Sequence, residues 1–133
     1  MIHVLDAGPM VAYLKAEPGA PVVAQTFTDN PGECYAHILN LAEVYYLFFR
    51  RGGISTAEAA IQTLLDAGVI PREDADSVFW KAAAAFKGRH PLALPDGFCL
   101  ALAQKLSGIV VTTDHAEFDP LTPLGYCPIL FIR

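Results

Sequence analysis

Short apolar runs recur along the chain and are separated by longer stretches of mixed polarity. The first run, Ile2 to Leu5, ends at Asp6, and later runs cover residues 34–38, 69–70, 109–112 and 129–132. Runs of this length, several of them rich in β-branched residues, are typical of strands that are buried on both faces. The pattern therefore predicts four to five short strands, each ending at a polar segment.

Helical stretches lie between these runs. Start and stop signals predict helices over residues 8–15, 21–28, 40–51, 55–68, 73–87 and 96–106. Asn40 can cap the third helix, which Gly52-Gly53 ends, and Ser55 with Glu58 forms a capping box for the next. Strands that alternate with helices indicate a sheet covered on both faces with right-handed crossovers. The predicted fold class is α/β, three-layered, with a mostly parallel central sheet of four to five strands.

Composition agrees with one globular domain spanning residues 1–133. Hydrophobic residues make up 53 % of the chain and charged residues only 17 %. The apolar share suffices for a full core, and the sparse charge leaves apolar surface for a partner or a second copy of the chain.

Targeting signals are not evident in the sequence. The apolar stretches are broken before the roughly 18 residues that a membrane span requires. The N-terminal MIHVLDAGPM has an acid and no basic leader, which disfavours a signal peptide. Cys34, Cys99 and Cys127 are odd in number and far apart, so we interpret them as reduced core thiols of a cytoplasmic protein.

The net charge of −5 argues at first against a nucleic-acid ligand. Four of these charges belong to acids that we assign below to one site, and the rest of the chain then carries about −1. Charge alone therefore does not exclude nucleic acid.

Four acids stand at the predicted ends of strands or starts of helices: Asp6, Glu43, Asp96 and Asp114. Each has an ordinary explanation as a helix cap or as a carboxylate that complements a helix dipole. Taken singly, the ordinary and the functional explanations are equally good.

Topology favours a common site. In a parallel sheet every strand ends at the same edge, which places Asp6 there and Glu43 one helical turn below. The helix from Asp96 spans about 16 Å and the strand after it returns about 13 Å, so Asp96 and Asp114 reach the same edge. Ligands of open α/β sheets bind at this edge.

Clustered carboxylates repel one another unless cations neutralise them. No cysteine pair or histidine cluster accompanies the acids. Hard oxygen ligands select Mg²⁺ or Mn²⁺, one or two of which could hold a scissile phosphate and activate water. The sequence therefore predicts a divalent-metal site that hydrolyses nucleic-acid phosphodiesters.

Four segments also resemble the signature blocks of PIN-domain ribonucleases, in style closest to the VapC-type toxins of bacterial toxin–antitoxin pairs. The segments are LDAGP, LAEVYYL, PDGFCLALAQKLSG and VVTTDHAEF, and the resemblance runs from Ile2 to the final strand.

The resemblance implies that Asp6, Glu43, Asp96 and Asp114 are the metal-binding catalytic acids. It assigns to Thr112 a hydroxyl that supports a metal or its water. It further implies Mg²⁺- or Mn²⁺-dependent cleavage of structured RNA, a homodimer, and an antitoxin that occludes the site.

Two positions depart from the family pattern. Gly8 stands where many relatives carry a small hydroxyl or amide residue. Glu117 occupies a place often taken by a shorter acid, so its part in a second metal site is provisional.

Other residues have two interpretations. Lys87, Arg89 and Lys15 could contact RNA, with plain solvation as the alternative. Aromatic residues surround one helix too completely for a single apolar face, which indicates core packing plus a dimer contact. This set comprises Tyr45, Tyr46, Phe48 and Phe49.

Two other functions compete with the nuclease. A catalytically inactive PIN-like scaffold could bind RNA or protein, although a scaffold has no need of four clustered acids. An aspartyl phosphatase would use Asp6 as nucleophile, but it requires a second Asp where the chain has Gly8.

Overall fold

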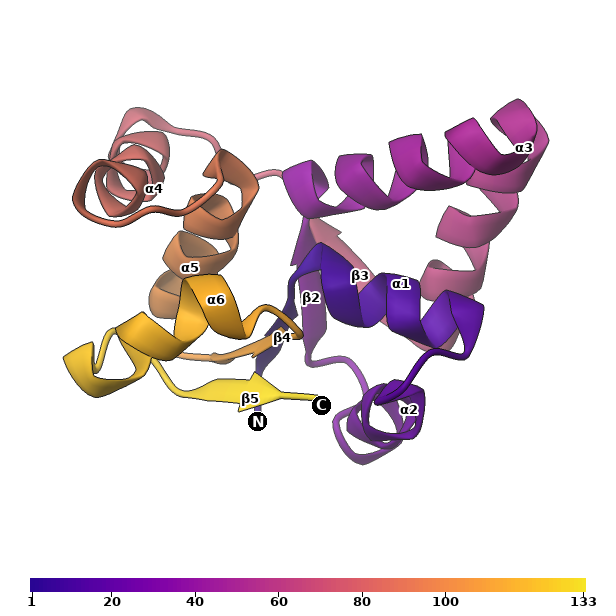
Figure 1. Cartoon of the computed structure of the whole chain (residues 1–133), viewed down its shortest axis with the longest axis horizontal. Coiled ribbons are helices and arrows are strands. Elements are labelled where there is room, and N and C mark those ends of the chain that lie inside the picture. Colours follow the sequence, from indigo (N-terminus) through magenta and orange to yellow (C-terminus); the bar gives the residue numbers. More distant parts are fainter.

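The computed structural model describes all residues, 1–133, and contains one five-stranded sheet. The strand order is β3-β2-β1-β4-β5, and every neighbouring pair is parallel (Figure 1). This confirms the predicted α/β class, and the five strands match the upper end of the predicted four to five. The strands are β1 His3–Leu5, β2 Cys34–His37, β3 Val69–Arg72, β4 Ile109–Thr112 and β5 Ile129–Phe131.

Helices cover both faces of the sheet, so the three predicted layers are confirmed. Helices α1, α2 and α3 lie on one side and α4, α5 and α6 on the other (Figure 1). None of them is long and apolar enough to cross a membrane. Their bounds are α1 Ala7–Lys15, α2 Ala20–Asp29, α3 Ile38–Ala67, α4 Ser77–Arg89, α5 Leu94–Leu106 and α6 His115–Phe118, with a 3₁₀ turn, η1, at Asp119–Leu124.

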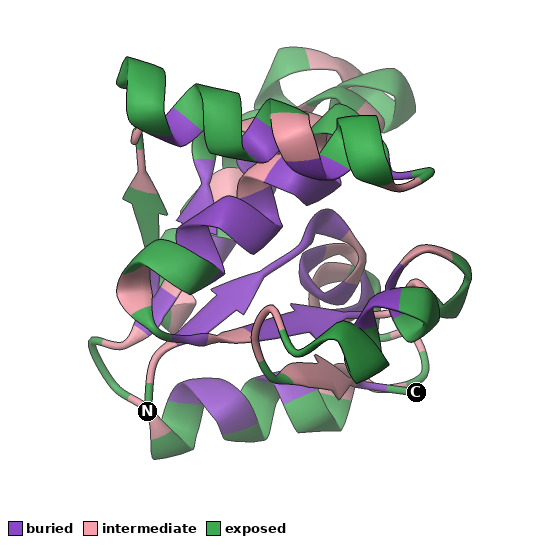
Figure 2. Cartoon of the chain, turned by 90° about the vertical axis from the view of Figure 1, so that its left-hand side faces the viewer, coloured by how far each residue is buried: buried purple, intermediate pink, exposed green.

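Two apolar cores sandwich the sheet. In β1, Leu5 packs into the core with α1 and α3, whereas Val4 packs into the core with α5 and η1. Successive side chains of a strand point to opposite faces, so a fully apolar run is what a doubly covered strand needs. Figure 2 shows the central strands buried and the outer faces of the helices exposed.

The start of α3 differs from the prediction. The helix begins at Ile38, and the Nδ1 atom of His37 caps it by accepting a hydrogen bond from the Leu39 amide at 3.1 Å. Asn40 lies inside the first turn and is fully buried. The prediction of an Asn40 cap is therefore wrong, because β2 ends three residues before Asn40 and the helix follows it directly.

The glycine pair kinks α3 instead of ending it. Gly52 and Gly53 have non-helical backbone angles between two helical halves, and Gly53 has a φ of 80° that favours glycine. The predicted capping box is not formed, since the Glu58 carboxylate accepts a hydrogen bond from the Tyr45 hydroxyl at 3.3 Å. At the next boundary β3 continues to Arg72, and α4 begins only after Asp76, which caps it.

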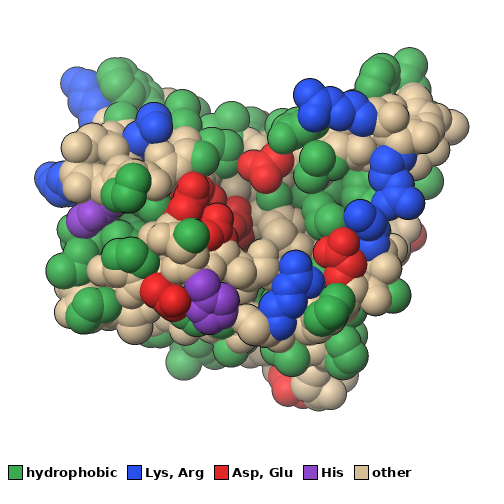
Figure 3. Space-filling model, viewed as in Figure 1, with side chains coloured by type: hydrophobic (Ala, Val, Ile, Leu, Met, Phe, Trp, Pro, Cys, Tyr) green, Lys and Arg blue, Asp and Glu red, His purple; other side chains and the backbone are tan.

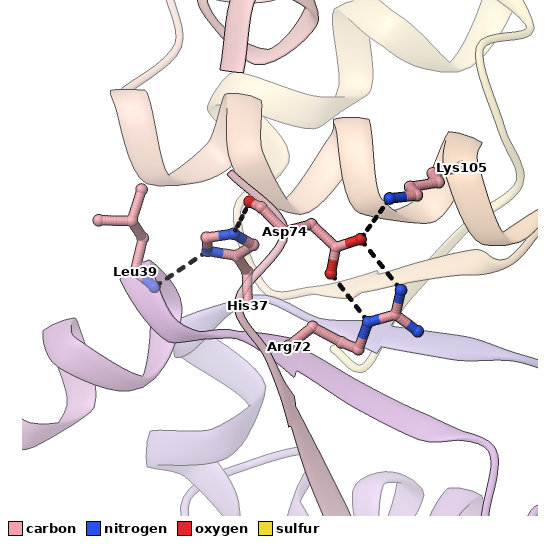
Figure 4. A network of polar contacts seen from close by, with 5 residues as sticks. All are labelled: His37, Leu39, Arg72, Asp74 and Lys105. Atoms are coloured by element: carbon pink, nitrogen blue, oxygen red, sulfur yellow. Dashed lines mark hydrogen bonds and ion pairs between the residues drawn. The ribbon is translucent and has the colours of Figure 1, made fainter. Parts of the chain in front are cut away.

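A polar network fixes the loop after β3 (Figure 4). The Asp74 carboxylate accepts two hydrogen bonds from Arg72, at 2.8 and 3.0 Å, and one from Lys105 of α5 at 2.6 Å. Nε2 of His37 donates to the Asp74 carbonyl at 2.8 Å, because Nδ1 of the same ring is an acceptor. The loop is thereby tied to the start of α3 and to α5.

The cationic partners lower the pKa of Asp74, chiefly through the hydrogen bonds from Arg72. Unfolded Asp74 takes up a proton near pH 4, whereas the folded residue stays ionised to lower pH. Its contribution to stability is therefore complete above about pH 4 and is lost as pH falls further.

We expect Asp74→Asn to lower the free energy of unfolding at pH 7 by about 1–3 kcal/mol, since the buried carboxylate makes three charge-assisted bonds. Urea unfolding between pH 7 and pH 3 measures the difference, which should shrink below pH 4. Asp66→Asn, an exposed acid that bonds only Gln62, is the matched control, with a change within about 0.5 kcal/mol. An equal loss in both variants would contradict the network's role.

Candidate active site

A pocket of about 280 Å³ opens at the carboxyl edge of the sheet. Figure 3 shows acidic side chains gathered near the middle of this face of the molecule. The structure thus brings the four predicted acids and the provisional Glu117 together. The lining residues are Asp6, Gly8, Glu43, Ala93, Asp96, Thr113, Asp114 and Glu117.

Strand order explains why the acids meet here. The chain winds outward from β1 through β2 to β3, and then returns to place β4 on the other side of β1. Adjacent crossovers leave in opposite directions between β1 and β4, which makes this the switch point where ligands of open α/β sheets bind. Asp6 directly follows β1, and Asp114 lies two residues beyond β4.

Three of the acids also cap helices, as their ordinary explanation predicts. Asp6 accepts a hydrogen bond from the Ala7 amide at the start of α1. Asp96 accepts one from the Ala93 amide at 3.1 Å, and Asp114 accepts one from the Glu117 amide at 3.0 Å. Each of these last two caps occupies one carboxylate oxygen and leaves the other oxygen for the pocket. Capping and lining the pocket are therefore compatible.

Glu43 has no such second explanation. It is the sixth residue of α3, beyond the first turn, and its half-buried side chain lines the pocket. Its ordinary explanation, as the acidic half of a capping box three residues after an Asn40 cap, fails because His37, not Asn40, caps α3.

Asp6 is the most firmly held of the acids. The Thr112 hydroxyl donates to its Oδ2 at 3.0 Å, and the Asn40 amide donates to its Oδ1 at 3.3 Å. Thr112 also accepts a hydrogen bond from the Asp114 amide at 3.1 Å, and Asn40 donates to the Pro95 carbonyl at 3.2 Å. Thr112 is fully buried and does not line the pocket, so it acts through Asp6 and Asp114. Sequence reasoning missed this role of Asn40, which only burial reveals.

Three of the carboxylates crowded at the pocket have raised pKa values. Burial, followed by the Glu117 side chain and the charge of Asp6, raises the pKa of Asp96 to about 9. Burial is also the largest cause of the raised pKa of Asp6 and of Glu43. No Lys, Arg or His lines the pocket to offset the negative charge. Such a site favours a bound cation.

The residues fit a hard divalent cation. Every charged group at the pocket is a carboxylate, and Oε2 of Glu117 is buried and accepts no hydrogen bond from an amide or hydroxyl group, while the Asp96 carboxyl group lies within hydrogen-bonding reach of the Glu117 side chain. Oxygen-only donor sets suit Mg²⁺ and Mn²⁺. No three acidic, histidine or cysteine side chains are yet close enough to enclose an ion. The fit therefore rests on the donor chemistry and on the unsatisfied Glu117 oxygen.

Comparison with protein families matches the PIN domain over residues 3–120. The chain belongs to the PIN-domain family. The family resemblance of the four sequence blocks is thereby confirmed. Membership of this family supports a nuclease activity for the chain. Comparison with curated proteins gives no match.

Solved structures share this PIN fold. DNA-bound VapBC from Salmonella typhimurium has a TM-score of 0.75 at 14 % identity, covering 100 % of this chain and 99 % of that chain. VapBC-1 from nontypeable Haemophilus influenzae has a TM-score of 0.73 at 18 % identity, covering 99 % of this chain and 98 % of that chain. VapC20 from Mycobacterium tuberculosis, described as a Sarcin-Ricin loop cleaving toxin, has a TM-score of 0.64 at 19 % identity. The match covers 81 % of this chain and 86 % of that chain. At these identities the likeness establishes the fold.

The three cations predicted to contact RNA do not line the pocket of this PIN domain. Lys15, at the far end of α1, pairs with Glu17 at 3.3 Å. Lys87 donates a hydrogen bond to the Leu92 carbonyl at 3.0 Å, and Arg89 is exposed at the end of α4. A contact with RNA beyond the pocket stays a prediction for all three.

The aromatic residues of α3 divide into two sets. Phe48 is buried and Tyr45 packs against the same core, whereas Tyr46 and Phe49 are 45 % and 47 % exposed. The exposed pair is the part of this helix that can make the predicted dimer contact, which stays a prediction.

Proposed function

We propose that this PIN-domain protein is an Mg²⁺- or Mn²⁺-dependent endoribonuclease. One observation carries the proposal: five carboxylates, from the residue after β1, from α3, from α5 and from the segment after β4, line one pocket that contains no cationic side chain. Such a concentration of buried charge costs folding stability and is understandable as a cation site.

Asp6, Glu43, Asp96 and Asp114 would hold the cation, and Glu117 would hold a second ion or a bound water. A divalent cation held there would neutralise the carboxylates, lower the pKa of a bound water and stabilise charge on the phosphate. The chain itself orients three of the acids. Thr112 and Asn40 hold the Asp6 carboxylate, and backbone amides at the starts of α5 and α6 hold Asp96 and Asp114. To enclose an ion, the carboxylates would have to move closer together than they are here.

RNA as substrate, and a toxin controlled by an antitoxin, are supported by the descriptions of similar structures. They include VapBC complexes and a toxin that cleaves the Sarcin-Ricin loop. Expression of the chain alone should arrest growth, and coexpression of a small protein from the neighbouring reading frame should restore it. Normal growth on expression of the active chain would count against the toxin role.

The assay that tests the proposal follows cleavage of a structured RNA by the purified chain. We expect cleavage with Mn²⁺ or Mg²⁺, no cleavage in excess chelator, and recovery when Mn²⁺ is restored, because carboxylates alone repel the phosphate. Full activity in chelator would contradict the proposal. Absence of cleavage under every metal condition, on a panel of structured and single-stranded RNAs, would favour the inactive scaffold.

A further inference from the structure

Thr113 carries an unused hydroxyl at the acid pocket. Thr113 lines the pocket, its Oγ1 lies beside Gly8 of the same pocket, and none of the side-chain hydrogen bonds of the chain involves this hydroxyl. The neighbouring Thr112 is different, because its hydroxyl is fully buried and both donates to Asp6 and accepts from the Asp114 amide. The single donor of the Thr112 hydroxyl is therefore already used by Asp6, whereas the donor of Thr113 is free.

Gly8 makes room for this hydroxyl. A Cβ atom placed on Gly8 would overlap Oγ1 of Thr113, while the Cβ and Cγ2 atoms of Thr113 would both be 3.4 Å away. Gly8 lies in the first turn of α1 and lines the same pocket. Any side chain at position 8 would therefore force the Thr113 hydroxyl to turn away. The residue pair is matched in size, with a hydroxyl from position 113 occupying the space beside Gly8.

The chemistry of the pocket indicates what this hydroxyl binds. Of the eight lining residues, five are acids, two are Gly8 and Ala93, and only Thr113 has a side chain that donates a hydrogen bond when the acids are ionised. A water molecule on a cation donates hydrogen bonds, which carboxylates can accept. The oxygens of a phosphodiester only accept hydrogen bonds, and ionised carboxylates offer them no donor. A phosphate in this pocket therefore needs a side-chain donor, and Thr113 has one.

We propose that the Thr113 hydroxyl donates a hydrogen bond to a non-bridging oxygen of the RNA phosphate at the acid pocket. This rests on the proposed nuclease function and adds to it a substrate-contacting residue. The hydroxyl would orient the phosphate opposite the carboxylates, and Gly8, which has no side chain, leaves the space that the hydroxyl occupies.

Thr113→Val removes the hydroxyl at nearly constant volume. We expect single-turnover RNA cleavage to fall about 10- to 100-fold, the usual effect of losing one hydrogen bond to a charged group. Thr113→Ser should retain most of the rate. Thr28→Val is the matched control, because Thr28 is exposed on α2 and its hydroxyl bonds only the Ala24 carbonyl.

Gly8→Ala tests the steric part of the proposal. In the wild-type background it should reduce cleavage about as much as Thr113→Val, because the new methyl group displaces the hydroxyl. In a Thr113→Ala background the same change should have little further effect, since the overlapping oxygen is gone. A double-mutant cycle measures this non-additivity. Additive losses would overturn the assigned arrangement.

Calorimetric titration with Mn²⁺ provides a readout that does not depend on cleavage. Thr113→Val should bind Mn²⁺ within about twofold of wild type, since its hydroxyl contacts phosphate and is not a metal ligand. A loss of tenfold or more would overturn the phosphate contact. Full cleavage by Thr113→Val would overturn this inference alone, whereas a wild-type chain that cleaves no RNA would overturn it together with the proposed function.

Discussion

Asp96→Asn should abolish RNA cleavage while leaving the fold intact. Asp96 is 7 % exposed, and its second carboxylate oxygen lies at the pocket with four other acids. Loss of a cation ligand removes several kcal/mol of transition-state stabilisation, so we expect a rate reduced by roughly a thousandfold or more. The amide oxygen of the substituted side chain can still accept the hydrogen bond from the Ala93 amide, so α5 keeps its cap.

The same variant should be at least as stable as the wild type without metal. Because burial raises the pKa of Asp96 to about 9, this side chain must take up a proton when the chain folds at pH 7 without metal, which destabilises the folded state. A neutral amide of the same shape needs no proton. Urea unfolding in chelator should show a gain of about 1–2 kcal/mol, a size common when a strained site is relieved. Asp66→Asn should change neither rate nor stability. If Asp96→Asn proves to be unfolded, its loss of activity says nothing about catalysis. Asp96→Glu is therefore measured as well. It keeps the carboxylate, should be folded, and should be more active than Asp96→Asn.

Gly97→Ala should be the most destabilising small substitution in α5. A Cβ atom on Gly97 would lie 2.5 Å from the Ala83 carbonyl oxygen of α4, a backbone atom that cannot rotate away. Both residues are buried where α4 and α5 pack together. The helices would have to separate, and overpacking of this kind costs about 2–3 kcal/mol. Because Gly97 adjoins Asp96, cleavage should fall as well.

Gly88→Ala is the matched control with the opposite sign. Gly88 lies in α4, is exposed, and has no atom within 4 Å of the position of an added Cβ. An alanine there removes only the helix penalty of glycine, so we expect a gain of roughly 0.5–1 kcal/mol. Thermal or urea unfolding of the two variants side by side measures both. A Gly97→Ala variant as stable as Gly88→Ala would contradict the described packing of α4 on α5.

The sequence contains enough to predict the sheet and the place of the acids. Buried parallel strands are continuous apolar runs, as at Ile109–Thr112, and each parallel strand ends at one edge. The convergence of Asp6, Glu43, Asp96 and Asp114 follows from that topology. It did not require a choice between caps and ligands, because three of the four residues both cap a helix and line the pocket.

The sequence pattern does not predict which side chain caps α3 or which residues pack together in the pocket, because these depend on competing contacts in the folded chain. Asn40 is a better cap than His37 by intrinsic preference, yet burial against Asp6 and Pro95 draws it into the site. His37 is held at the cap position by its second bond, to the Asp74 carbonyl. The pairing of Gly8 with Thr113 joins residues 105 positions apart, and no periodicity predicts it.

The five carboxylates are proposed to form one divalent-cation site, and Mn²⁺ titration by calorimetry tests this most directly. The wild-type chain should bind Mn²⁺ at micromolar to millimolar concentration, and Asp96→Asn should weaken that binding at least about tenfold, as loss of a direct ligand does. Asp66→Asn should bind as the wild type does. Absence of Mn²⁺ binding by the wild type at millimolar concentration, or unchanged affinity in Asp96→Asn, would contradict the account.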